Sequence, residues 1–183
     1  MKAVILAGGK GTRLTPYTEI LPKPLMPIGD MPILEVLLRQ LKMAGVAEVI
    51  LTVGHLAHLL KAFFQDGDRL GIKITYSYEE KPLGTAGPLS LVAGKLDSTF
   101  LVCNGDILTT LNFQELIKVH CQSGAIALSV VCLVEYWLAG CAVELSVRVR
   151  AGLRRAAAIE VMVMGVYRLC DIVCDWPGVA AEM

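Results

Sequence analysis

A glycine-rich segment near the start of the chain carries the residues best suited to binding an anion. Gly8, Gly9 and Gly11 follow an apolar run, and without side chains they allow backbone amides to close on phosphate oxygens. Arg13 and Lys23 lie shortly downstream and can add positive charge. The combination of glycines and cations predicts a binding site for a polyphosphate.

Two commoner glycine motifs do not fit this segment. A P-loop requires the spacing GxxxxGK[ST], which the residues from Gly8 onward do not provide. A dinucleotide fingerprint requires a third glycine at position 14, where this chain has Leu14. An ordinary strand-to-helix turn is the alternative for GGxG alone, whereas the longer GGxGTRL with a downstream PKP is more specific.

Two later segments place a carboxylate at the end of an apolar strand. Glu79 opens EEKPLGTAG (residues 79–87), and Asp106 closes FLVCNGD (residues 100–106). Parallel sheets bind ligands at the carboxyl ends of their strands, and a carboxylate beside a phosphate site can hold Mg²⁺. The alternatives are solvated strand-end charges at Glu79 and a common turn at Asn-Gly-Asp.

Strands and helices that could position these residues alternate over residues 1–131. Apolar runs predict buried strands, apolar residues at helical spacing predict helices, and Gly45, Gly71 and Gly124 lie between helix and strand. Such a series predicts an α/β fold of Rossmann-like type, a mostly parallel sheet with helices on both faces. The expected strands are residues 2–7, 48–53, 73–78, 99–103 and 125–131, and the expected helices are residues 33–44, 55–64, 85–95 and 113–120.

Composition narrows the class of protein. The 183 residues are 55% hydrophobic and 19% charged, which excludes intrinsic disorder. Lys and Arg total 17 and balance 17 Asp and Glu, so binding to nucleic acid or anionic lipid by bulk charge is not expected. Any site for a polyanion must therefore be local.

Neither a secretory signal nor a membrane span is expected. The first seven residues carry one lysine, and the most apolar window, residues 125–143, contains Glu135 and Gly140. Six cysteines form no CxxC pair, which favours free thiols in a reducing cytosol over a structural metal. We therefore expect a cytoplasmic protein with no nucleic-acid or membrane partner.

Residues 132–183 differ in composition from the rest. All nine lysines lie at or before Lys118, whereas five of eight arginines and four of six cysteines lie in this tail. Residues 147–158 show no clean strand or helix period. A surface or interface extension and translation in a shifted reading frame both stay open, and we do not expect a separate domain here.

The segments LAGGKGTRLTPYT and LPKPLMPIG resemble the signature of the sugar-1-phosphate nucleotidylyltransferases, with mannose-1-phosphate guanylyltransferases as the best match. The resemblance covers residues 1–131, implies a Rossmann-like fold and Mg²⁺, and implies a nucleoside triphosphate and a sugar 1-phosphate as substrates. It implies catalytic contacts from Arg13 and Lys23, metal binding by Asp106, and nucleotide contacts from Leu6, Gly8, Gly9, Gly11, Thr12, Glu79 and Gly84.

Alternatives stay open for the nucleotide base and for whether the chain is an active enzyme. A carboxylate such as Glu79 only accepts hydrogen bonds, and guanine offers two adjacent donors, so GTP with mannose 1-phosphate is favoured. Thymidylyl or uridylyl transfer to glucose 1-phosphate is the alternative within the family. Relatives also carry a later lysine and a second aspartate that cannot be placed here. A non-catalytic sensor, a regulatory subunit paired with a full-length paralogue, a homo-oligomer and an inactive fragment therefore all stay open.

Overall fold

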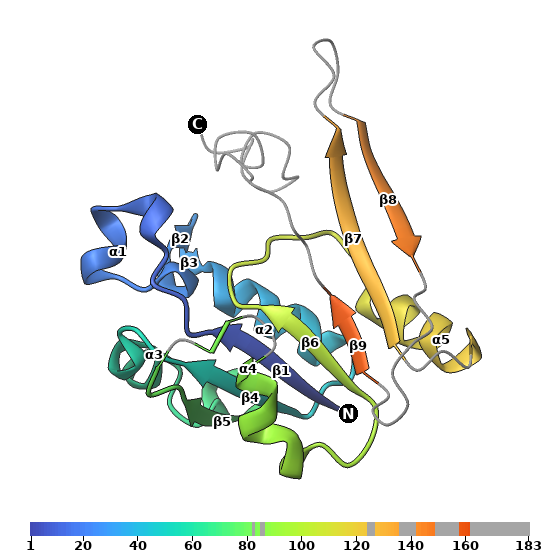
Figure 1. Ribbon diagram of the computed structural model, residues 1–183, viewed down its shortest axis with the longest axis horizontal. Helices are drawn as coiled ribbons and strands as arrows, with labels where there is room; N and C mark the ends of the chain where they lie inside the picture. Colours follow the sequence, from blue (N-terminus) through green and yellow to red (C-terminus); the bar gives the residue numbers. More distant parts are fainter. Residues whose placement is uncertain (82, 85–86, 124–126, 136–141, 149–157, 162–183) are drawn as a thin grey trace.

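Seven strands form one sheet in the order β5-β4-β1-β6-β9-β7-β8 (Figure 1). The computed structural model describes residues 1–81, 83–84, 87–123, 127–135, 142–148 and 158–161. All neighbouring strands are parallel except β7 and β8. The strands are β1 (Lys2–Ala7), β4 (Glu48–Val53), β5 (Lys73–Tyr78), β6 (Phe100–Asn104), β7 (Ala127–Glu135), β8 (Ala142–Arg148) and β9 (Ala158–Val161).

The central strands are buried on both faces, which is why they read as continuous apolar runs. In β1, the side chains of Ala3, Val4 and Ile5 are fully buried, and β1 lies between β4 and β6 in parallel register. β2 (Pro27–Ile28) and β3 (Met31–Pro32) form a separate two-stranded ribbon. The ribbon leads directly into the helix that begins at Ile33.

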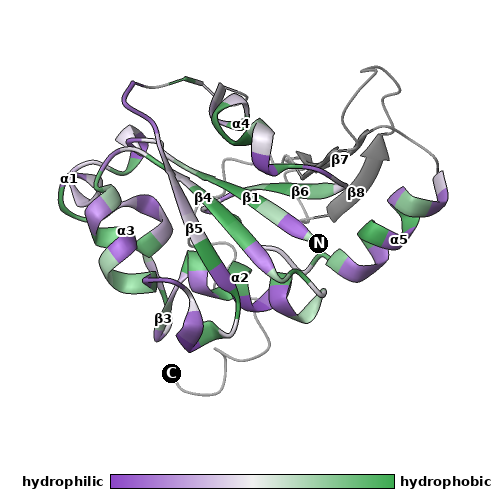
Figure 2. Cartoon of the chain, turned by 90° about the horizontal axis from the view of Figure 1, so that it is seen from below, coloured by the Kyte–Doolittle hydropathy of each residue, from purple (hydrophilic) through white to green (hydrophobic). Residues whose placement is uncertain are grey.

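Helices cover both faces of the sheet (Figure 2). α2 (Ile33–Met43) packs an apolar stripe against the larger core, because Leu34, Leu37, Leu38 and Leu41 recur at helical spacing and are fully buried. α3 (Ala57–Phe64) and α5 (Phe113–Ser123) contribute to the same core. α4 (Gly87–Val92) covers the opposite face, and α1 (Tyr17–Ile20) is a single turn. Short 3₁₀ turns are η1 (Thr12–Leu14), η2 (Lys23–Leu25), η3 (Asp68–Leu70) and η4 (Ala93–Lys95).

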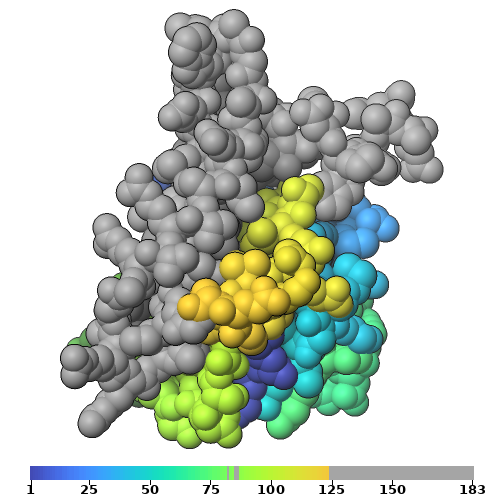
Figure 3. All heavy atoms as spheres, turned by 90° about the vertical axis from the view of Figure 1, so that its right-hand side faces the viewer, coloured from blue at the N-terminus to red at the C-terminus, as the bar shows by residue number. Residues whose placement is uncertain are grey.

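The smaller core lies under α4. Val92 of α4 packs there with Val4 of β1, Ile50 of β4 and two residues of β6, Phe100 and Val102. On the far side of the molecule, α5 lies at the surface (Figure 3), with Val119 and Cys121 exposed and His120 buried. The sheet is thus held between two helical layers, as the alternating pattern of the sequence predicts.

The fold class and most element boundaries are confirmed. β1, β4 and β5 begin and end where the apolar runs do, and Gly45 and Gly71 adopt positive φ angles of 87° and 63° at the expected turns. α3 begins later than predicted because Leu56 takes a left-handed φ of 53° before the first turn. Residue 124, the third expected turn glycine, lies outside the described residues.

The tail contributes two strands to the sheet. β9 pairs with both β6 and β7, and β8 pairs with β7 in the antiparallel direction. The segment 147–158, which shows no clean period, includes the last two residues of β8 and the first residue of β9. Its remaining residues, 149–157, lie outside the described part of the chain. Within the described residues, none of the helices has the length and apolarity needed to cross a membrane.

Candidate nucleotide-binding site

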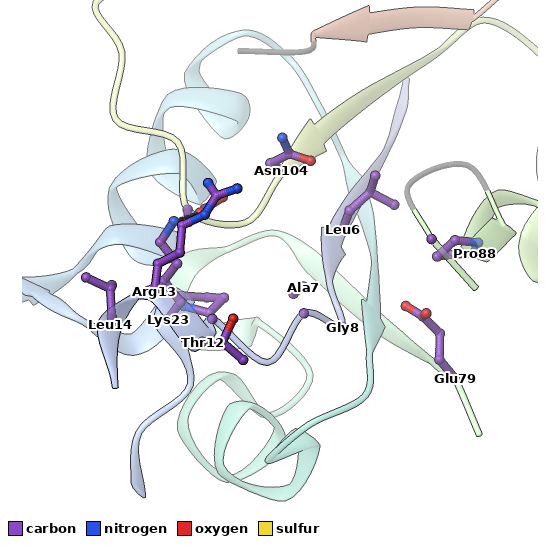
Figure 4. A pocket seen from close by; sticks show the side chains of 15 residues that line it. Leu6, Ala7, Gly8, Thr12, Arg13, Leu14, Lys23, Glu79, Pro88 and Asn104 are labelled. Atoms are coloured by element: carbon purple, nitrogen blue, oxygen red, sulfur yellow. Dashed lines mark hydrogen bonds and ion pairs between the residues drawn. The ribbon is translucent and has the colours of Figure 1, made fainter. Parts of the chain in front are cut away.

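A cavity of about 480 Å³ opens at the carboxyl ends of β1, β5 and β6 (Figure 4). Every site residue predicted from the sequence lines it, so three segments far apart in the chain meet at one place. The lining residues are Leu6, Ala7, Gly8, Gly9, Gly11, Thr12, Arg13, Leu14, Lys23, Pro24, Glu79, Gly84, Pro88, Asn104 and Asp106.

The glycine loop after β1 is shaped by close approach. A Cβ at Gly8 would collide with the carboxylate of Glu79, so only glycine allows that side chain to lie across the loop. Gly11 has a φ of 63°, in the left-handed region, and begins the η1 turn. Gly9 has no atom within 4 Å of its Cβ position, which leaves its backbone open to a ligand.

Lys23 and Asp106 form an ion pair in the wall of the cavity. Lys23 begins η2, and Asp106 follows β6 in a turn that is tied to β1 because the Gly105 amide donates to the Leu6 carbonyl at 2.9 Å. The two side chains are 37% and 30% exposed, so both remain open to a ligand. The pair places one cation and one carboxylate side by side in the lining of the cavity.

Arg13 adds a second cation on the same side of Gly8 as Lys23. It is the middle residue of η1, it is exposed, and within the described part of the chain it has no acidic partner. Figure 4 shows Arg13 and Lys23 on one side of Gly8 and Glu79 on the other. The cavity therefore has a cationic end and an acidic end, separated by the glycine loop.

Glu79 is held at the acidic end by its own backbone. Its amide donates to the Val53 carbonyl at 2.9 Å, which continues the pairing of β5 with β4 past Tyr78. Its Oε2 accepts a hydrogen bond of 3.4 Å from the Leu83 amide. Gly84, with a φ of 75°, completes this side of the cavity. An acceptor-only side chain therefore lies at the end of the cavity away from the cations.

Five lining residues were not predicted. Asn104 and Pro24 belong to motifs that the sequence analysis identified, Asn-Gly-Asp and Pro-Lys-Pro, so their neighbours could have drawn attention to them. Ala7 and Leu14 lie within the glycine-loop motif LAGGKGTRL, whereas Pro88 lies just beyond EEKPLGTAG and no chemical signal in the sequence points to it.

Residues 2–137 match the protein family described as "Nucleotidyl transferase". The chain belongs to this family. It is 41% identical over 139 residues to a UTP–glucose-1-phosphate uridylyltransferase of Synechocystis sp., covering 69% of this chain and 36% of the relative. It is 44% identical over 139 residues to a mannose-1-phosphate guanylyltransferase catalytic subunit beta of Danio rerio, covering 74% of this chain and 39% of the relative.

The fold also matches that of a solved structure. HddC from Yersinia pseudotuberculosis, solved in complex with GMP-PN, superposes with a TM-score of 0.62 at 28% identity, over 72% of this chain and 58% of that protein. The predicted resemblance to sugar-1-phosphate nucleotidylyltransferases is confirmed, and the named relatives include both guanylyl and uridylyl transferases. The chain spans between 33% and 39% of the length of the curated relatives considered.

Proposed function

We propose that the protein to which this nucleotidyl transferase chain belongs joins a nucleoside triphosphate to a sugar 1-phosphate and releases pyrophosphate. The observation that carries the proposal is the cavity itself, in which a glycine loop separates Arg13 and Lys23 from Glu79. The triphosphate of a nucleotide is anionic and suits the end with Arg13 and Lys23, whereas its base is uncharged and offers N–H donors to an acceptor such as Glu79. The two ends of the cavity match the two ends of a nucleotide.

In this reaction a sugar-phosphate oxygen attacks the α-phosphorus of the nucleotide. The bond from that phosphorus to the oxygen bridging to the β-phosphate breaks, and pyrophosphate leaves with the electron pair. Because two anions must approach each other, charge neutralisation and positioning contribute more than a strong base. Lys23 stabilises the α-phosphate region, Arg13 the departing pyrophosphate, and the backbone amides of the glycine loop hold the phosphates.

The residues present fit a magnesium ion. Mg²⁺ takes one or two carboxylates together with substrate phosphates and water, and Asp106 supplies a partly exposed carboxylate in the cavity wall. Within the described residues there is no cluster of three His, Cys, Asp or Glu side chains, so phosphate oxygens and water would complete the shell. When bound, the ion would neutralise phosphate charge. It would also compete with Lys23 for Asp106 and leave that lysine available to the nucleotide.

GTP is the proposed nucleotide and mannose 1-phosphate the proposed acceptor. Glu79 supports guanine, because a carboxylate can accept from the adjacent N1–H and N2–H donors of that base. Uracil and thymine present one donor between two acceptors, which suits an amide side chain better. The mannose-1-phosphate guanylyltransferases among the relatives support the same choice. We place the reaction in the cytoplasm, where reduced thiols such as Cys103 and Cys121 persist.

Pyrophosphate release by the 183-residue chain tests the proposal. The chain is mixed with MgCl₂, each of GTP, UTP and dTTP, and mannose or glucose 1-phosphate. Release that requires both substrates, and is fastest with GTP and mannose 1-phosphate, supports the proposal in full. Release that is fastest with UTP or dTTP keeps the reaction and overturns the base assignment. Nucleotide binding without release favours a non-catalytic sensor, a regulatory subunit or an inactive fragment of such an enzyme.

A further inference from the structure

Two residues outside the cavity lining, Thr18 and His55, contact the backbone of the glycine loop. Thr18 of α1 is buried, with 3% of its surface exposed, and its hydroxyl donates a 3.0 Å hydrogen bond to the Gly11 carbonyl. Its methyl group lies 3.0 Å from the Cβ position of Gly11 and fills the space under the loop. Thr18 therefore fixes the far end of the loop by a hydrogen bond and by packing.

His55 links Thr18 to the near end of the loop. His55 follows β4, and its ring Nε2 lies 3.2 Å from the main-chain carbonyl oxygen of Thr18. Because a carbonyl oxygen can only accept, this contact requires His55 to carry a proton on Nε2. The backbone amide of His55 also donates to the Gly8 carbonyl at 3.5 Å. A continuous chain of contacts thus runs from Gly8 through His55 and Thr18 to Gly11.

These hydrogen bonds determine the orientation of two peptide groups, the one between Gly8 and Gly9 and the one between Gly11 and Thr12. A trans peptide is planar, so the carbonyl of one residue and the amide of the next point in opposite directions. With the Gly8 and Gly11 carbonyls directed at His55 and Thr18, the amides of Gly9 and Thr12 are directed away from them. Both residues line the cavity, and neither amide donates a hydrogen bond within the described residues. Free amides pointing at an anion site attract phosphate, whereas carbonyls there would repel it.

We propose that Thr18 and His55 are positioning residues that hold the Gly9 and Thr12 amides toward the phosphates of the nucleotide. The proposal rests on the proposed function for the ligand, but its structural part concerns the loop alone. Figures 1 and 2 show α1, which contains Thr18, and α3, which begins two residues after His55, at the same end of the sheet. A preorganised loop binds its ligand without first losing conformational freedom, so loosening it weakens binding.

The first test reads the loop directly by ¹⁵N NMR on the full chain. In the wild type, the His55 ring proton is expected on Nε2. The Gly9 and Thr12 amides are expected to be rigid, with order parameters near ~0.85. Thr18→Val keeps the shape of the side chain and removes the hydroxyl, and His55→Leu removes the ring donor. Either change should lower those order parameters toward ~0.6.

Conservative variants separate positioning from a general loss of structure. Thr18→Ser keeps the hydroxyl and loses only the methyl group, and His55→Gln keeps an N–H donor at a similar distance from the backbone. Both should therefore keep the loop more rigid than Thr18→Val and His55→Leu do. The dissociation constant for Mg·GTP should rise about five- to tenfold in Thr18→Val and His55→Leu, and stay within about twofold in the conservative pair.

A bare Nε2 in wild-type His55 would overturn the proposal. So would loop amides that keep their order parameters in Thr18→Val and His55→Leu. The wild-type tautomer measurement needs no variant, so the test survives if a substitution prevents folding. If the loop responds as expected but the wild type binds no nucleotide, the proposed function fails and the positioning of the loop stands.

Discussion

Lys23 and Asp106, which are 83 positions apart in the sequence, meet as an ion pair in the wall of the cavity that the glycine loop enters. Neither charge is buried, so the pair contributes little to stability. The two side chains can instead separate when substrate binds, so that Lys23 is free to bind a phosphate and Asp106 to bind a cation. The first two predictions follow from this exchange.

Lys23→Ala should slow nucleotidyl transfer by about 10²- to 10³-fold, because losing one preorganised charge contact to the reacting phosphate costs ~3–4 kcal/mol in the transition state. Pyrophosphate release under saturating substrates measures the effect. Lys61→Ala removes an exposed lysine of α3 that is not among the residues lining the cavity, and it serves as the control. Turnover at the wild-type rate in Lys23→Ala would remove the lysine from the mechanism.

Asp106→Asn should abolish the gain in GTP affinity that magnesium provides. The amide keeps the size of the side chain but loses the negative charge that attracts Mg²⁺. Isothermal titration of GTP with MgCl₂ and with EDTA, in wild type and variant, gives the two ratios to compare. An Asp106→Asn protein whose GTP affinity still rises with magnesium as the wild type does would place the ion elsewhere.

Glu79→Gln should weaken GTP binding by about 10- to 100-fold, because a charged hydrogen bond contributes about 1.5–3 kcal/mol and the new amide places a donor against a guanine donor. UTP binding should weaken less or improve. The dissociation constants of both nucleotides decide the outcome. Equal losses for GTP and UTP would show that Glu79 does not discriminate between bases.

Gly8→Ala should displace the Glu79 carboxylate, which occupies the position of the added methyl group. Because that carboxylate is the free end of a flexible side chain, we expect a free energy of unfolding within about 1 kcal/mol of the wild type. GTP affinity should fall as it does in Glu79→Gln. Gly94→Ala, where nothing lies within 4 Å, is the matched control. Unchanged GTP affinity in Gly8→Ala would contradict the contact.

The fold should lose stability in alkaline solution. Burial raises the pKa of the Cys103 thiol to about 12, and burial together with nearby Tyr78 and Asp66 raises the pKa of Tyr76 to about 12. Unfolding restores ordinary values of 9.0 and 10.0, so the unfolded chain loses these protons first as the pH rises. The stabilisation is complete below those ordinary values and is lost as the pH rises toward about 12.

Urea unfolding at about pH 8 and about pH 10.5 measures this loss. The free energy of unfolding should fall between the two conditions. Cys103→Ala removes one of the two titrating groups and should show a smaller fall than the wild type, although the variant itself is less stable. A wild-type free energy that does not change over this range would contradict the assignment.

The parts of the fold that depend on local pattern could be predicted from the sequence. β1, β4 and β5 are continuous apolar runs bounded by polar or turn residues, and burial on both faces of a parallel sheet requires that pattern. The glycine loop, Glu79 and Asp106 could be placed at one sheet edge for a related reason, since each follows a strand of the same parallel series.

Contacts between distant segments could not be predicted in the same way. Nothing in the local pattern records that Lys23 pairs with Asp106, or that Glu79 lies against Gly8, because the relative placement of strand-end loops depends on packing. Thr18 and His55 were not predicted as site residues, because a threonine in a short turn and a histidine after a glycine are common surface features. Their roles are visible only once the Gly8 and Gly11 carbonyls are located.

The most direct test of the account is isothermal titration calorimetry of the folded 183-residue chain with Mg·GTP. We predict a single saturable site per chain whose heat is reduced in both Lys23→Ala and Asp106→Asn. A folded wild-type chain that gives no binding heat with Mg·GTP, Mg·UTP or Mg·dTTP would contradict the assignment of this cavity to a nucleoside triphosphate.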